Sequence, residues 1–157
     1  MSVADAKLLD MHERALNMVR AAVRGLGAEA LRWREPDTGK TIAGEVVHVC
    51  EAERFWLRDA GIEPQLDVPS EEPASVEELL AALDRAQQRF GDLLSEKPGD
   101  HNLRWRVCRV SQHALYHAVR IVHFRTRQQP DWTMPHWDRP GSWEHAVDLV
   151  TDLILEG

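Results

Sequence analysis

The chain has 157 residues, and 43% of them are hydrophobic, which is enough for one domain with a single buried core. We therefore expect one domain over residues 1–157. The net charge of -7 excludes the broad basic surface that non-specific binding to nucleic acid or to an anionic membrane requires. Because the chain has only two cysteines, no export signal and no stretch of about 18 apolar residues, we expect a cytoplasmic protein with neither nucleic-acid nor membrane partners.

The first half of the chain predicts two helices. Apolar residues recur at helical spacing over residues 3–26, and Gly25 and Gly27 end that segment. After a connector of turn-forming residues, Thr41 suits the N-cap of a second helix that runs to about residue 59. The proline-rich stretch that follows, residues 61–74, is long enough to span a bundle, so the next helix can run in either direction.

The second half predicts three more helices. Ser75 begins a capping-box pattern for a third helix ending near residue 96, and Asn102 suits the N-cap of a long fourth helix that Pro130 ends. A segment rich in Trp and Pro precedes a short fifth helix expected over residues 142–155. Since no alternation typical of β-strands is present, we expect an all-α protein, a four-helix bundle with an additional short C-terminal helix.

Histidines are the most informative residues of this sequence. His113 and His117 are four residues apart on the fourth helix, which places both rings on one face, one turn apart. His48 interrupts an apolar run of the second helix, so two helices each direct an imidazole toward the bundle interior, where helical bundles build metal sites. From spacing alone, core or surface histidines that hydrogen-bond to carbonyls and carboxylates are the better explanation, because ligand-like pairs are common by chance.

Two segments carry a resemblance to a known family. The sequence GKTIAGEVVHVCEAERFWL, residues 39–57, resembles the second-helix signature of the DinB/YfiT-like superfamily, in which a capping Ser or Thr opens a helix that carries a His and then a Glu-Arg-aromatic-Trp run. The sequence HALYHAVR, residues 113–120, resembles the paired-histidine helix of the same family. Both segments occur in the family's order and at its separation.

This resemblance implies a four-helix bundle with one divalent transition metal, commonly zinc or nickel, on His48, His113 and His117. It also implies a small-molecule substrate, and some branches of the family use a low-molecular-weight thiol such as mycothiol or bacillithiol as cosubstrate. Many relatives have Gly and then Gln where this chain has Val119 and Arg120. The resemblance therefore extends to the ligands but implies no particular substrate pocket.

Three histidine ligands leave a coordination position for water or substrate, whereas structural zinc sites are usually closed by four protein ligands. Cys50 and Cys108 point well away from His48 and His113 around their helices, so we expect both to be small buried apolar residues. A site of this kind can lower the pKa of water or of a thiol, so that a nucleophile exists at neutral pH.

Several other residues are candidates for roles around the ligands. Glu45 and Glu51 each lie three residues from His48 and are our candidate catalytic carboxylates, either as general base or as acceptor of a ligand ring proton; the alternative is that both are ordinary exposed carboxylates. The candidates for substrate binding are Arg109, Arg120 and Tyr116, and for the two arginines the alternative is a solvated helix face.

The remaining polar and aromatic residues have simpler interpretations. We expect His12 to be a hydrogen-bonded core histidine and Glu53 to pack or to pair with an arginine. The tryptophans of the C-terminal segment can line a hydrophobic substrate site or fix that segment to the bundle; they are Trp132, Trp137 and Trp143.

The leading hypothesis is a metal-dependent enzyme, of hydrolase or thiol-transferase type, that activates water or a low-molecular-weight thiol toward a small organic substrate. The alternative is a non-catalytic metal-binding or dimerisation module of the same fold. A homodimer is expected from the apolar outer faces of the helices and from the family.

Overall fold

The computed structural model describes residues 2–63, 66–70 and 75–135 of the chain. In this part of the chain all regular elements are helices. They are α1 (Val3–Val23), α2 (Ala28–Arg32), α3 (Ile42–Asp59), α4 (Val76–Glu96) and α5 (His101–Gln128). The all-α prediction is therefore confirmed, whereas the helix expected over residues 142–155 lies outside the described residues.

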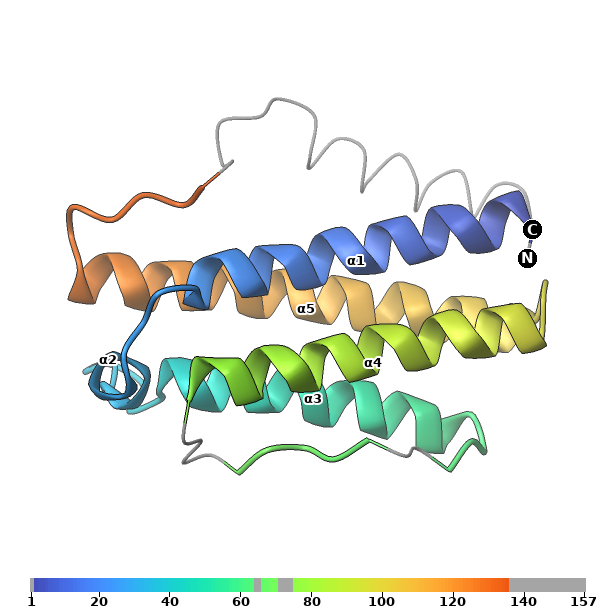
Figure 1. Ribbon diagram of the computed structural model, residues 1–157, viewed down its shortest axis with the longest axis horizontal. Helices are drawn as coiled ribbons and strands as arrows, with labels where there is room; N and C mark the ends of the chain where they lie inside the picture. The colour runs from blue at the N-terminus through green and yellow to red at the C-terminus, as the bar shows by residue number, and fades with distance from the viewer. Residues whose placement is uncertain (1, 64–65, 71–74, 136–157) are drawn as a thin grey trace.

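The four long helices lie side by side as a bundle (Figure 1). Helix α1 packs against α4 and α5, and α3 packs against the same two helices from the other side. Helix α4 begins at the same end of the bundle as α3, the end where α2 lies, so α3 and α4 run in the same direction (Figure 1). This settles the helix direction that the length of the 61–74 connection left open. It also makes α3 and α5 antiparallel neighbours.

The helix ends follow the capping rules, although one cap and one short helix differ from expectation. Thr41 accepts a hydrogen bond from the Gly44 amide at 2.9 Å, as expected for the cap of α3. Helix α5 is capped by Asp100 rather than by Asn102, because the Asp100 carboxylate accepts from the Leu103 amide at 2.9 Å and also complements the positive helix end. The five-residue helix α2 was not predicted, since one turn is too short to show a hydrophobic period.

The core consists of two apolar clusters with buried polar groups between them. One cluster lies toward α2 and the other toward the opposite end, and His12 of α1 and Glu53 of α3 lie where one gives way to the other. The Nε2 atom of His12 is 2.9 Å from Oε1 of Glu53, and both residues are fully buried. His12 is thus the hydrogen-bonded core histidine that we expected. Glu53 pairs with this histidine rather than with an arginine, because it faces the interior.

Both cysteines are unpaired thiols. Burial raises the pKa of Cys50 to about 12 and also raises the pKa of Cys108, which is partly buried. The protonated form is therefore favoured at both positions, as expected for thiols that pack as small apolar residues. Among the described helices, none combines the length and apolar character needed to cross a membrane.

Candidate metal centre

Three histidines from two helices meet at one edge of the bundle. His113 and His117 come from consecutive turns of α5, and the antiparallel neighbour α3 brings His48 against them. One ring nitrogen of each residue lies within 4.8 Å of those of the other two. The ring centroids of His48 are 5.0 Å from His113 and 4.8 Å from His117. The sequence spacing on α5 and the packing of α3 against α5 together create this cluster.

The cluster lies at the rim of the α3–α5 interface rather than in the bundle interior. His117 is buried, His113 is half-buried, and the His48 side chain is 51% exposed. This differs from the interior position that we expected for His48. The difference arises because the residues on both sides of it, Val46, Val47 and Val49, occupy the buried face of α3 and leave His48 on the outer face. One side of the cluster is consequently open to solvent.

His113 is neutral near pH 7. Burial lowers its pKa to about 4, and the charges of His117, His48 and Arg109 act in the same direction. A neutral imidazole offers a nitrogen lone pair, which is the form that binds a metal. His113 therefore has the protonation state that a ligand needs.

The nitrogen positions fit one transition-metal ion. In a tetrahedral zinc site with bonds of about 2.0–2.1 Å, two ligand nitrogens are separated by about 3.3 Å. The Nε2 atoms of His113 and His117 are 3.1 Å apart. His48, the third member, has a half-exposed side chain that is free to adjust its rotamer. The donor set of three imidazoles suits zinc, nickel or a similar ion.

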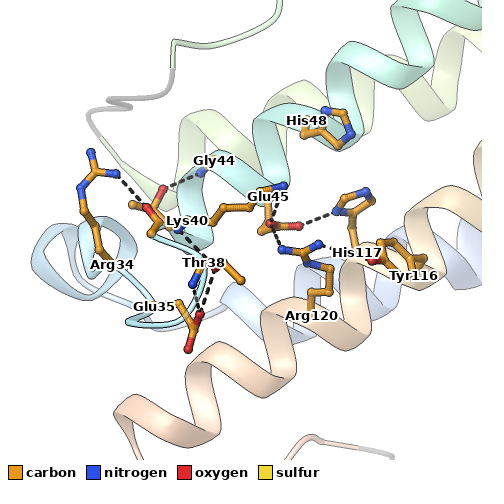
Figure 2. Close-up of polar contacts among 12 residues, drawn as sticks. Arg34, Glu35, Thr38, Lys40, Gly44, Glu45, His48, Tyr116, His117 and Arg120 are labelled. Carbon is orange, nitrogen blue, oxygen red and sulfur yellow. Dashed lines mark hydrogen bonds and ion pairs between the residues drawn. The ribbon is translucent and has the colours of Figure 1, made fainter.

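A buried carboxylate supports His117 from the side away from the cluster. Oε2 of Glu45 is 2.5 Å from Nδ1 of His117, and Oε1 is 3.0 Å from the Arg120 guanidinium (Figure 2). Burial acts to raise the pKa of Glu45, but the hydrogen bond from His117 and the charges of His117, Arg120 and Lys40 lower it overall. With Glu45 ionised, His117 donates from Nδ1 and directs the lone pair of Nε2 toward the other two histidines.

The other predicted residues surround this centre at different depths. Oε2 of Glu51 lies 3.7 Å from Nδ1 of His48 on the solvent side, and half of the Glu51 side chain is exposed. Tyr116 is exposed, and its ring meets the His117 ring edge-on at 5.0 Å. The Tyr116 hydroxyl accepts a hydrogen bond from Arg120 at 3.3 Å. Arg120 is thus held between Glu45 and Tyr116.

Arg109 lies apart from this group. Its guanidinium is 6.0 Å from the ring centroids of Trp56 and Trp105, and it donates a hydrogen bond to Gln112 at 3.3 Å. Of the C-terminal tryptophans, Trp132 stacks at 4.2 Å against Arg125 of α5, whereas Trp137 and Trp143 lie outside the described residues. Trp132 therefore contacts the bundle and has no contact with the histidines among the interactions described.

One feature beside the cluster gave no signal in the sequence. A cavity of about 460 Å³ opens next to His48 and is lined by the first turns of α3, by Lys40 and by arginines that precede it. Arg34 and Lys40 reach the cavity because the connector between α2 and α3 folds back on itself. Neither helical periodicity nor motif spacing predicts such a loop.

The chain shares its helical core with a known family. Its sequence has no match among the curated proteins, nor among the solved structures. The family model described as the DinB superfamily matches residues 11–128, a range that contains the three histidines, Glu45 and all four long helices except the first residues of α1. This match covers most of the 157 residues. The chain therefore belongs to the DinB superfamily.

Proposed function

We propose that this protein is a metal-dependent enzyme that activates water or a low-molecular-weight thiol toward a small organic substrate. His48, His113 and His117 would hold one divalent transition metal, zinc or nickel. The observation that carries the proposal is the convergence of three imidazoles within 4.8 Å at a rim that is open on one side. An open side suits a reactive centre, because a closed structural site would use four protein ligands.

The metal would supply a Lewis acid that lowers the pKa of water or of a thiol to near neutrality. The protein's own residues would divide the remaining tasks. Glu45 holds the proton of His117 Nδ1 and so keeps the other ring nitrogen available. Glu51, on the exposed side of His48, would accept a proton from an incoming nucleophile, the role of a general base. Tyr116, which is exposed beside His117, would contact the substrate.

Metal analysis of three proteins tests the ligand set. Wild type is expected to bind close to one zinc per chain, His113→Ala to lose tight binding, and His123→Ala to behave as wild type. His123 is a matched control because it is an exposed histidine on the same helix, outside the cluster. A stoichiometry that is the same in all three proteins would show that these residues are not the ligands.

Thermal melting gives a second readout, with a sign that follows from the ligands. Zinc should raise the melting temperature near neutral pH, because it binds the folded state. This increase should shrink toward pH 5, since protons compete for imidazoles whose ordinary pKa is about 6.5.

Turnover of thiol or ester probes that disappears on chelation would distinguish an enzyme from a non-catalytic metal-binding module. Light scattering at micromolar concentration would test the expected homodimer separately.

A further inference from the structure

The cavity beside His48 has an unusual charge for this protein. Although the chain carries a net charge of -7, three cationic side chains line this one cavity: Arg32, Arg34 and Lys40. Its volume of about 460 Å³ falls within the range of about 300–1,000 Å³ that is common for small-molecule sites. His48 forms part of its wall, so the cavity borders the candidate metal centre on the side of this histidine.

The three cations are not neutralised by carboxylates at hydrogen-bond distance within the described ranges. Arg34 donates to the backbone oxygen of Gly39 at 2.9 Å, and the ammonium of Lys40 is 3.8 Å from Oε1 of Glu45. That carboxylate already accepts from His117 and Arg120 (Figure 2). Three arginines elsewhere in the bundle have close carboxylate partners: Arg20 with Asp84, Arg104 with Asp5 and Arg106 with Asp59. Among the described residues, Arg32 and Arg34 therefore have no close carboxylate partner, and Lys40 shares Glu45 with His117 and Arg120.

The connector between α2 and α3, which carries Arg34 and Lys40, is ordered by its own hydrogen bonds. Oε2 of Glu35 accepts from the amides of Asp37 and Thr38 at 3.0 and 2.8 Å, and its other oxygen pairs with Arg127 of α5. Asp37 also pairs with Arg127, at 2.6 Å. The two acidic groups of this loop are thus drawn to Arg127.

Backbone contacts complete the loop. An antiparallel bridge joins Arg34 to Thr41, and the amide of Gly39 donates to the backbone oxygen of Glu35 at 2.7 Å. Gly39 has a φ of 68°, a conformation that glycine adopts most readily. Arg34 and Lys40 are therefore held on one short, folded loop. Such preorganisation reduces the entropy lost on binding an anion.

The first turn of α3 adds to the positive potential. Thr41 and Gly44 line the cavity at the N-terminal end of this helix, where the helix dipole favours negative charge. Two carboxylates also line it. Glu45 is already paired, and Glu51 lies beside His48, at the metal end of the cavity.

We propose that this cavity binds the anionic group, carboxylate or phosphate, of the protein's small organic substrate. The anion lies against Arg32, Arg34 and Lys40, and the part of the substrate that reacts extends toward His48. This inference rests on the proposed function, because it makes the cavity the substrate-holding part of the metal centre. It assigns anion binding to the connector rather than to Arg120, whose guanidinium is engaged by Glu45.

Titration of metal-free protein with succinate and with inorganic phosphate tests the site without any reaction. At low ionic strength, either anion should shift the backbone amide resonances of residues 32–44. The Arg34→Gln, Lys40→Gln double variant should weaken binding by about tenfold, since two exposed charge pairs are lost. Tighter binding of succinate would indicate a carboxylate substrate, and tighter binding of phosphate would indicate a phosphorylated one.

Arg58→Gln is the matched control, because Arg58 is an exposed arginine of α3 at the end of the helix away from the cavity. It should bind both anions as wild type does. Equal affinity in wild type and double variant, or no binding of either anion by wild type at millimolar concentration, would overturn the site. Zinc titration of the same proteins separates the two proposals. If wild type binds zinc normally but its anion binding does not depend on Arg34 and Lys40, the anion site alone is overturned. If anion binding depends on these two residues but wild type takes up no zinc, the proposed function alone is overturned.

Discussion

His12 and the histidine cluster of α3 and α5 show how the same residue type acquires different properties within one bundle. His12 is enclosed between the two apolar clusters and has one fixed partner, Glu53. His48 and His113 belong to a cluster that reaches the surface, and their ring nitrogens face other imidazoles. A buried imidazole with a carboxylate partner stabilises the fold through that contact. A group of imidazoles that reaches the surface is available to an ion. The difference lies in the partners and in access from solvent.

The largest expected effect comes from breaking the enclosed pair. Glu53→Leu should lower the free energy of unfolding by about 3–5 kcal/mol, because it leaves His12 buried without its partner. Zinc affinity of the folded variant should stay unchanged. The double variant His12→Leu, Glu53→Leu should recover part of the loss, since no polar group is then left unpaired. Urea unfolding with a parallel zinc titration measures both quantities.

Glu13→Leu is the control for this comparison, because Glu13 is an exposed carboxylate next to His12 in sequence. Its effect on the free energy of unfolding should stay within about 0.5 kcal/mol. If Glu53→Leu were no more destabilising than Glu13→Leu, the enclosed pair would not have the structural role assigned to it.

A smaller effect is expected at the open cluster when its buried support is changed. Glu45→Gln should weaken zinc binding by about 10- to 100-fold, because the amide no longer holds the Nδ1 proton of His117 with a negative charge. Glu51→Gln should weaken it by less than about threefold, since Glu51 is half-exposed and 3.7 Å from His48. Competition with a chromophoric chelator measures the affinities. Equal losses in the two variants would contradict the supporting role of Glu45.

The smallest effect concerns a carboxylate that is as buried as Glu53 but has an arginine partner. Burial raises the pKa of Asp5, but hydrogen bonds from Arg104 and Ser2 lower it overall, from 3.8 to about 2. Because the folded-state pKa is depressed, the stabilisation is complete above about pH 4 and is lost as the pH falls toward 2. Asp5→Asn should therefore lower the free energy of unfolding by roughly 1–2 kcal/mol at pH 7. The gap to wild type should close between pH 4 and pH 2 in urea titrations.

Asp10→Asn serves as the control, because Asp10 pairs with Arg14 on the exposed face of the same helix. It should change stability by less than about 0.5 kcal/mol at either pH. A loss in Asp5→Asn that is as large at pH 2 as at pH 7 would show that the carboxylate charge is not what stabilises α1.

Features with local determinants could be predicted from the sequence. The caps at Thr41 and Ser75 are short-range hydrogen bonds, so the starts of α3 and α4 could be predicted. The pairing of His113 with His117 follows from helix geometry alone. The fold class followed from the hydrophobic period, and the family model bears out the resemblance carried by residues 39–57 and 113–120.

Features that depend on how helices dock could not be predicted in this way. The exposure of His48 depends on the rotation of α3 against α5, which its own apolar neighbours did not reveal. The pairing of Arg120 with Glu45 joins residues from different helices, and the sequence alone favoured a solvated helix face for Arg120. The connector that carries Arg34 and Lys40 is ordered by Glu35 and by a residue of α5, so its fold is not encoded locally.

The three histidines come from two helices that are far apart in the sequence, and this affects the order in which the metal centre assembles during folding. His113 and His117 are separated by 4 residues, whereas the contact of His117 with Glu45 closes a loop of 72 residues. A newly formed α5 thus already presents two imidazoles, but the third joins only when α3 has docked. Because forming such long-range contacts is slow compared with forming a helical turn, weak chelation should precede tight chelation during refolding. Time-resolved zinc uptake would thereby report the moment at which the two halves of the chain come together.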